Sequence, residues 1–274
     1  MNCAHRELQV PGARLRYRDD GAGRAVVLVH GWTLDLDVWD PQAALATELR
    51  VVRYDRRGFG LSTGQPSLEA DVADLRELLG ALGIVSPLLA GMSQGARVVL
   101  EFAARHPGVA RGLLLDGPPP LAATAPDRNQ GGAEITDLPM ANFREIATRD
   151  GLEAFRRAWS AHPLTQLVTH DATSHALLAR ILARYPGRDL LEGAPVRESI
   201  DAQLLSQVRT PALIVNGERD TEARRRAGLA LRAALSAADH LYIPQAAHLP
   251  NLDAPQAYNR IMIEFARRHL PVAA

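Results

Sequence analysis

The chain has 274 residues, and its 31 basic and 31 acidic side chains give a formal net charge of zero. This balance offers no overall basic surface for nucleic acid, so we predict no nucleic-acid partner. No apolar run approaches the roughly 18 residues of a membrane span, so we expect no membrane association. The 47% apolar and 23% charged fractions are typical of globular proteins.

Two residue types restrict the chemistry. All 31 Lys and Arg positions are arginine, which excludes a lysine nucleophile, a pyridoxal Schiff base and a Walker-type phosphate loop. The one cysteine, Cys3, cannot form an internal disulfide or a cysteine-based zinc site. We therefore predict no cofactor and no metal site. The N-terminal segment 1–10 is polar and lacks the apolar stretch of a secretion signal, so we expect a cytoplasmic protein.

The order of elements along the chain predicts an α/β fold. A strand, a turn and a second strand are expected in the first twenty residues, because the segments 8–10 and 15–18 flank Pro11-Gly12. Short apolar runs without polar alternation are typical of strands covered on both faces, as in a parallel sheet. Such runs occur at 25–29, 51–54, 87–90, 112–115, 212–215 and 240–243. Apolar residues at helical spacing predict helices at 70–82, 94–106 and 256–269.

The alternation of strand and helix stops in the middle of the chain. A glycine- and proline-rich stretch follows Asp116, and from about 139 to 205 the pattern is mainly helical. Strand character returns at Pro211. We therefore predict one sheet domain formed by 1–117 and 208–274, with 118–207 inserted as a helical cap. An insertion at strand ends is well placed to cover a ligand crevice.

Residues 91–95, Gly-Met-Ser-Gln-Gly, match the G-x-S-x-G pattern of a nucleophile elbow. The pattern follows an expected strand and opens an expected helix, a context in which a sharp turn projects the serine hydroxyl above the sheet edge. Ser93 is therefore the candidate nucleophile. The alternative is a glycine-rich turn in which the serine only caps the helix.

A serine hydroxyl is a weak nucleophile, so Ser93 requires a base and a group that orients the base. Of the nine histidines, His248 follows the last expected strand and should lie at the same sheet edge. The order serine, acid, histidine places the acid between them, and Asp220 follows a strand and a turn. Asp116, which also ends a strand, is the rival acid. Glu218 is a weaker competitor.

Acyl transfer also needs donors for the developing oxyanion. In this architecture one donor is the amide after the nucleophile, here Gln94, and the other comes from the loop after the strand 25–29. That loop begins His30-Gly31-Trp32, so the amide of Trp32 is the second candidate. His30 is expected to make structural hydrogen bonds.

Five segments carry a resemblance to a known family: 30–32, 55–62, 91–95, 216–220 and 248–251. The chain resembles the α/β-hydrolase superfamily, in particular its small capped esterases and enol-lactonases, including 3-oxoadipate enol-lactonase-like proteins. The resemblance implies a mostly parallel twisted sheet with helices on both faces and a helical cap between strands. Gln94 departs from the methionine of many relatives and is expected to change the pocket wall.

These residues together predict an enzyme, a cofactor-independent serine hydrolase that cleaves a small-molecule carboxylic ester or lactone. Ser93, Asp220 and His248 would form the triad. Two alternatives remain: the same triad used for carbon–carbon bond hydrolysis or perhydrolysis, and a non-catalytic ligand receptor on the same scaffold. Arg56 and Arg57 are candidates to bind a substrate carboxylate.

Overall fold

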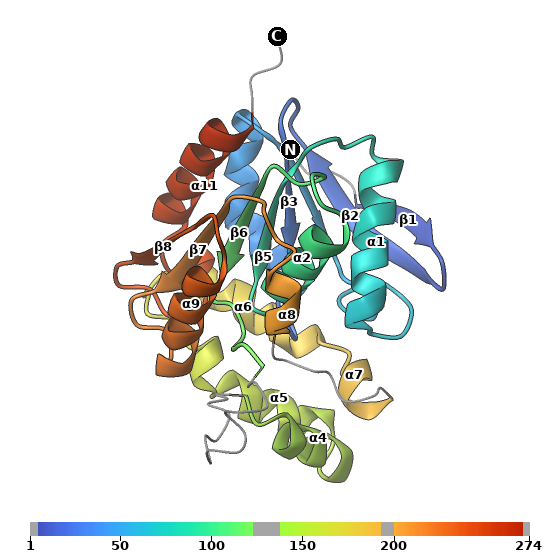
Figure 1. Cartoon of the computed structure of the whole chain (residues 1–274). Helices are drawn as coiled ribbons and strands as arrows, with labels where there is room; N and C mark the ends of the chain where they lie inside the picture. The colour runs from blue at the N-terminus through green and yellow to red at the C-terminus, as the bar shows by residue number, and fades with distance from the viewer. Residues whose placement is uncertain (1–4, 123–137, 193–199, 271–274) are drawn as a thin grey trace.

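A central sheet of eight strands organises the molecule, which we describe from a computed structural model (Figure 1) covering residues 5–122, 138–192 and 200–270. The strands lie in the order β1-β2-β4-β3-β5-β6-β7-β8. The first two form an antiparallel hairpin on the edge of the sheet, and the strands from β3 to β8 are parallel. The bounds are β1 Arg6–Val10, β2 Ala13–Asp20, β3 Ala25–Val29, β4 Arg50–Tyr54, β5 Leu88–Met92, β6 Gly112–Asp116, β7 Ala212–Gly217 and β8 Ala238–Ile243.

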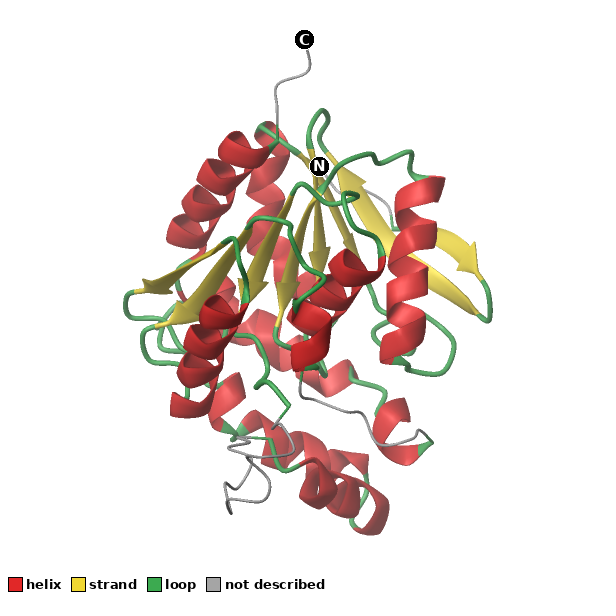
Figure 2. Ribbon diagram, in the orientation of Figure 1, coloured by secondary structure: helices red, strands yellow, loops and turns green. Residues whose placement is uncertain are grey.

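Helices cover both faces of this sheet (Figure 2). One face carries α1 (Leu68–Ala81), α2 (Gln94–Arg105) and α9 (Glu222–Ala234); the other carries the 3-10 turns η1 (Leu36–Thr47) and α11 (Pro255–His269). Every residue of β3 is buried, and alternate residues of a strand point to opposite faces. Val26 and Leu28 therefore join the core of one layer, and Val27 and Val29 join the other. The predicted α/β fold with a mostly parallel sheet is confirmed.

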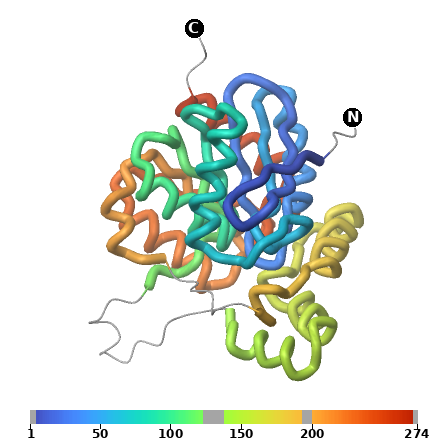
Figure 3. The backbone as a smooth tube through the Cα atoms, turned by 90° about the vertical axis from the view of Figure 1, so that its right-hand side faces the viewer, coloured from blue at the N-terminus to red at the C-terminus, as the bar shows by residue number. Residues whose placement is uncertain are grey.

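A run of helices interrupts the alternation between β6 and β7. The structure describes α4 (Met140–Arg149), α5 (Leu152–Ser160), the short turn η2 (Pro163–Thr165), α6 (Ala172–Arg184) and α7 (Arg188–Leu191), which we call the inserted helices. They lie beyond the carboxyl ends of the parallel strands, where the arrowheads in Figure 2 point, and they form a separate layer in Figure 3. The last helix of this stretch, α8 (Ala202–Leu205), packs instead against α2. Parts of the predicted cap, 123–137 and 193–199, lie outside the described residues.

Outside the inserted helices, element bounds differ from the sequence expectations by a few residues, except at η1, at α9 and at the short helix α10 (Pro250–Asp253), which was not expected. The sequence pattern did not predict η1, because Pro41 interrupts its apolar spacing and the segment forms 3-10 turns after Asp35, whose side chain caps them. The pattern also gave no bounds for α9, whose surface is rich in arginine. Among the described residues, no helix is long and apolar enough to cross a membrane.

Candidate active site

Ser93 occupies a strained turn between β5 and α2. Its backbone has φ of 51° and ψ of −117°, a region that residues with a side chain rarely adopt. The Ser93 amide donates to the carbonyl oxygen of Asp116, 2.7 Å away at the end of β6. The neighbouring strand thus holds the turn in place, and the side chain is only partly buried.

The glycines around Ser93 are required by close backbone approach. A Cβ atom on Gly91 would lie 2.3 Å from the carbonyl oxygen of Gly95. A Cβ on Gly95 would lie 2.2 Å from the carbonyl oxygen of Val29 in β3. The start of α2 therefore packs directly on two strands, and larger residues would push the turn away from the sheet.

Asp220 and His248 form a hydrogen-bonded pair at the same edge of the sheet. Nδ1 of His248 lies 3.1 Å from Oδ1 and 3.2 Å from Oδ2 of Asp220. Asp220 follows β7 and His248 lies on the loop after β8. Gly117, which follows β6, leaves room for the imidazole, since a Cβ there would lie 2.7 Å from Cε1 of His248. The pair is buried, at 4% and 3% exposure.

Neighbouring donors hold the carboxylate of Asp220. The Thr221 amide donates to Oδ1 at 2.8 Å, and Nδ2 of Asn216 donates to Oδ2 at 3.2 Å. Burial by itself raises the pKa of Asp220, but the His248 imidazole, the Asn216 amide and the Arg224 guanidinium bring that pKa below its usual range. Oδ1 of Asn216 lies 3.0 Å from Nε2 of His240, so the polar chain extends to the last strand.

Asp116, the rival acid, has a different environment. Its carboxyl is fully buried, and burial together with the nearby Asp220 carboxylate raises its pKa well above the usual range, although the Tyr258 hydroxyl opposes this. A carboxyl that favours the neutral form is poorly suited to stabilise an imidazolium. His248 is hydrogen-bonded to Asp220 instead. The geometry therefore favours Asp220, as the sequence order predicted. Glu218, the weaker competitor, accepts from the amide of Gln245.

Ser93 and His248 line one narrow pocket between the sheet and the inserted helices. Its free volume is about 20 Å³, about the room that one water molecule needs. Within the described part of the chain no hydrogen bond joins Ser93 to His248; such contacts are often long before a substrate binds. The other lining residues are mainly apolar: Gly31, Trp32, Thr33, Leu34, Met92, Leu138, Trp159, Leu164, Thr165 and Leu249.

The loop after β3 lies against the nucleophile turn. A Cβ on Gly31 would lie 3.3 Å from Cβ of Ser93, and the next residue, Trp32, lines the same pocket as Ser93. The Gln94 amide belongs to the first turn of α2, where helix geometry leaves amides without a partner in the helix. The two candidate oxyanion donors therefore come from different segments, Trp32 from the loop after β3 and Gln94 from the residue that follows Ser93.

The Gln94 side chain corrects one expectation. It does not form part of the pocket wall: its Oε1 accepts from Nη1 of Arg56 at 2.7 Å, inside the protein. Arg56 itself is buried and bound to Asp71, at 2.9 Å from Nε and 2.5 Å from Nη2. Arg57 is paired with Asp74. Both candidates for substrate carboxylate binding are thus engaged by acidic residues of α1.

His30 makes two hydrogen bonds within the core. The Arg56 amide donates to Nε2 at 2.9 Å, so Nδ1 carries the proton and donates to the Gly31 carbonyl at 2.8 Å. Burial and the Arg56 charge lower the pKa of His30 to about 3, although the Gly31 carbonyl opposes this. The imidazole is therefore neutral and fixes the loop after β3, which fits a structural role.

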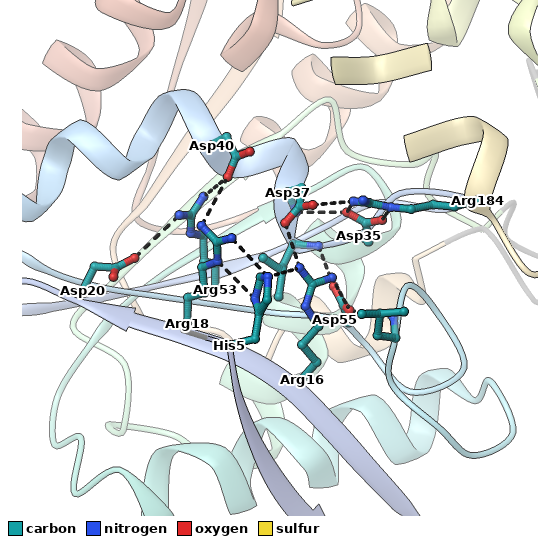
Figure 4. A network of polar contacts seen from close by, with 12 residues as sticks. His5, Arg16, Arg18, Asp20, Asp35, Asp37, Asp40, Arg53, Asp55 and Arg184 are labelled. Atoms are coloured by element: carbon teal, nitrogen blue, oxygen red, sulfur yellow. Dashed lines mark hydrogen bonds and ion pairs between the residues drawn. The ribbon is translucent and has the colours of Figure 1, made fainter. Parts of the chain in front are cut away.

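A largely buried ionic network includes residues of this loop (Figure 4). Arg184 of α6 donates to Asp35 and Asp37, each at 2.6 Å, and Arg16 of β2 reaches Asp37 and Asp55. Burial and the Asp35 carboxylate raise the pKa of Asp55 to about 7, opposed by Arg16 and by two backbone amides. The network joins the inserted helices to the hairpin strands through the loop.

Sequence reasoning missed several residues that the structure brings to the site. Trp159 of α5 lines the pocket, although the sequence pattern assigned it no role in the site. Asn216 and Asp189 were not singled out, because a lone amide or carboxylate beside a strand or in a short helix carries no spacing signal. No group of three or more metal-ligating side chains that could hold an ion occurs in the described ranges.

Several known proteins resemble this chain in sequence or in fold. A protein from Synechocystis sp. that carries the provisional name of a non-heme chloroperoxidase is 36% identical over 225 residues, 74% of this chain and 76% of that protein. An esterase from Thermogutta terrifontis superposes with a TM-score of 0.80, 23% identity and coverage of 97% and 99% of the two chains. The enol-lactonase of Burkholderia xenovorans superposes with a TM-score of 0.77 and 24% identity, and the match covers 95% of this chain and 99% of the enol-lactonase.

The two structural likenesses show a shared fold. The family pattern described as "Alpha/beta hydrolase family" matches residues 26–261, most of the chain. This chain belongs to the alpha/beta hydrolase family.

Proposed function

We propose that the protein is a cofactor-independent serine hydrolase that cleaves a carboxylic ester or lactone through an acyl-enzyme on Ser93. The observation that carries this proposal is the buried pair of His248 and Asp220, in which His248 lines the same pocket as the strained Ser93. A nucleophile, a base and a group that orients the base are the three parts that acyl transfer requires.

In the first half of the reaction, Nε2 of His248 takes the proton of the Ser93 hydroxyl as the oxygen attacks the substrate carbonyl. The new C–O bond places a negative charge on the carbonyl oxygen, which the amides of Trp32 and Gln94 stabilise. His248 then gives its proton to the leaving alkoxide as the ester bond breaks. The ionised Asp220 keeps the imidazole oriented and stabilises its charged form.

In the second half, water attacks the acyl-enzyme while Nε2 of His248 accepts one of its protons. The tetrahedral intermediate again uses the two amides, and the proton returns to the oxygen of Ser93 as the acid product leaves. A lactone differs only in that the alcohol and acid stay joined in one product. Neither half of the cycle needs a metal or a redox group.

The chemistry of the pocket wall supports an uncharged acyl or alcohol group in the substrate. The described residues that line it are apolar or carry hydroxyls, apart from His248. Four of them, Leu138, Trp159, Leu164 and Thr165, come from the stretch between β6 and β7. We therefore propose that 118–207 serves as a cap over the core formed by 1–117 and 208–274. The cytoplasmic location stays a prediction.

Perhydrolysis is the second candidate, because a relative at 36% identity carries a chloroperoxidase name. Acetic acid would acylate Ser93 with release of water, and hydrogen peroxide in place of water would then release the acyl group as a peracid while the proton returns to Ser93. The peracid transfers one oxygen atom to a halide ion and becomes the carboxylic acid again. The test is bromide oxidation with acetate and hydrogen peroxide. A rate that Ser93→Ala abolishes supports this activity, and a rate equal to that of the buffer excludes it.

Fluorophosphonate labelling tests the main proposal. We expect the reagent to modify Ser93 alone, as mapped by peptide mass spectrometry, and to stop hydrolysis in a panel of short esters and lactones. Modification of another residue with loss of activity would contradict the proposal. Saturable binding of panel compounds with no product, in single-turnover assays, would favour a ligand receptor.

A further inference from the structure

Three polar contacts tie the loop after β3 to the inserted helices. The indole Nε1 of Trp32 donates to Oδ2 of Asp189 in α7, at 2.6 Å. The indole Nε1 of Trp159 in α5 donates to Oγ1 of Thr33, at 2.7 Å. Arg184 at the end of α6 binds both oxygens of Asp35. Each tie joins a residue of the loop to a different inserted helix.

Asp189 is held rigidly inside the protein. Its side chain is 2% exposed, and its second oxygen accepts from the hydroxyl of Tyr185. Arg144 of α4 donates to its backbone carbonyl at 2.9 Å, which fixes α7. Aromatic rings surround the Trp32 indole with centroids 4.8 to 6.2 Å away: Phe143, Phe155, Trp159 and Tyr185. The rings thus pack around the indole, and its N–H points at the carboxylate of Asp189.

The backbone beside Trp32 needs this support. Thr33 has a φ of 62°, and a β-branched residue in this region is strained by about 1–3 kcal/mol. Its hydroxyl donates to the carbonyl oxygen of Trp32 at 2.6 Å while it accepts from Trp159. A strained conformation persists only where its surroundings enforce it. The inserted helices supply these contacts.

We propose that Asp189 is a positioning residue for the oxyanion hole. It acts through the Trp32 indole, which fixes the backbone of Trp32 and aims its amide at the position of the developing negative charge. Trp159 supports the same loop through Thr33. This inference rests on the proposed function, because the Trp32 amide has a catalytic task only in acyl transfer. The inserted helices thereby complete the catalytic centre as well as covering it.

If Asp189 positions an oxyanion donor, its substitution should weaken binding of the transition state more than binding of the substrate. Full loss of one oxyanion donor costs about 10²- to 10³-fold in kcat; loosening the donor should cost less. We expect Asp189→Asn to lower kcat about 10- to 100-fold and to change KM less than threefold. The affinity of a phenylboronic acid, whose adduct with serine places an oxygen in the oxyanion hole, should fall in parallel.

A matched control variant shows whether an effect of Asp189→Asn comes from the position of Asp189 or only from the loss of a negative charge. Asp150, at the exposed end of α4, pairs with Arg149 on the surface, so Asp150→Asn removes the same charge from the inserted helices. We expect that variant to retain the wild-type kcat and boronate affinity. Thermal melting followed by circular dichroism shows whether each variant is folded at the assay temperature.

A double-mutant cycle tests the route through the indole. Trp32→Phe keeps an aromatic ring and removes the N–H that Asp189 accepts. When Asp189→Asn is added to Trp32→Phe, kcat should fall by less than a further twofold relative to Trp32→Phe alone. Additive effects of the two changes would overturn the proposed route. If Asp189→Asn does not fold, Trp32→Phe and Trp159→Phe each test one tie, and unchanged kcat and boronate affinity in both would overturn the inference.

The outcomes also separate this inference from the proposed function. Hydrolysis that depends on Ser93 but is unaffected by Asp189→Asn overturns the inference alone. Equal hydrolysis by wild type and Ser93→Ala overturns the proposed function. Boronate affinity then still tests Asp189, because unchanged affinity in Asp189→Asn counts against positioning whatever the substrate.

Discussion

Asp220 presents both carboxylate oxygens to Nδ1 of His248, at 3.1 and 3.2 Å, while Asp116 lies buried nearby without a hydrogen bond to that imidazole among those the structure describes. The two carboxyls differ in protonation as well as in position. Donors around Asp220 lower its pKa, whereas burial and the Asp220 charge raise that of Asp116. This difference separates their expected roles.

Exchanging each acid for its amide tests this assignment. Asp220→Asn should lower kcat for ester hydrolysis by about 10³- to 10⁴-fold, because the imidazole loses the partner that sets its tautomer and charge. Asp116→Asn should stay within about tenfold of wild type, since a neutral carboxyl and an amide have the same charge. Steady-state kinetics on one chromogenic ester measures both. The reverse order of losses would make Asp116 the acid.

Asn216 should contribute to catalysis indirectly, through its hydrogen bond to the carboxylate of Asp220. Its amide donates to the carboxylate at 3.2 Å, and hydrogen bonds to charged groups contribute about 1.5–3 kcal/mol. Asn216→Ala should therefore lower kcat about 10- to 100-fold, less than Asp220→Asn. In the Asp220→Asn background the same change should have little further effect. Equal losses in both backgrounds would show that Asn216 acts by another route.

Two helical glycines form a matched pair for the nucleophile turn. A Cβ on Gly95 in α2 would lie 2.2 Å from the Val29 carbonyl oxygen, whereas a Cβ on Gly80 in α1 meets nothing within 4 Å. Gly95→Ala should destabilise the fold by about 1–3 kcal/mol through overpacking. Gly80→Ala should stabilise it by about 0.5–1 kcal/mol. Urea unfolding measures both, and a Gly95→Ala protein as stable as wild type would contradict the close approach.

His30 should make the protein sensitive to acid. Its pKa falls from 6.5 to about 3 on folding, so between these values the unfolded chain binds a proton that the folded chain does not. His30 therefore makes a contribution to the free energy of unfolding that is complete above pH 6.5. This contribution falls by about 1.4 kcal/mol per pH unit as the pH drops from 6.5 toward 3.

His30→Asn isolates this contribution from other titrating groups. Asp55, whose pKa is raised to about 7, acts in the opposite sense, since its stability contribution falls as the pH rises from about 4 to 7. The difference in unfolding free energy between wild type and His30→Asn should therefore narrow as the pH falls from 7 to 4. A constant difference across urea titrations in that range would mean that His30 titrates normally.

The fold was predictable because its signals are local. Apolar runs such as Val26–Val29 mark strands covered on both faces, and Gly91 to Gly95 mark the turn that exposes Ser93. The pairing of Asp220 with His248 followed from strand order, since parallel strands end at one edge of the sheet. The site residues assigned from that order stay predictions until activity is measured.

Other parts of the site depend on contacts between distant segments, which periodicity does not encode. The Trp32 indole meets Asp189 across 157 positions of the chain, and a single buried carboxylate has no repeating pattern. The Gln94 side chain was misplaced for the same reason: its partner, Arg56, comes from another loop. Tertiary packing, more than local propensity, decided the direction of these side chains.

The central claim is that Ser93 carries the acyl group. The most direct measurement is the hydrolysis of a short p-nitrophenyl ester by Ser93→Ala beside wild type, with thermal melting to show that both are folded. We expect a kcat at least about 10⁴-fold below wild type with an unchanged melting temperature. Full activity in the folded variant would contradict the claim.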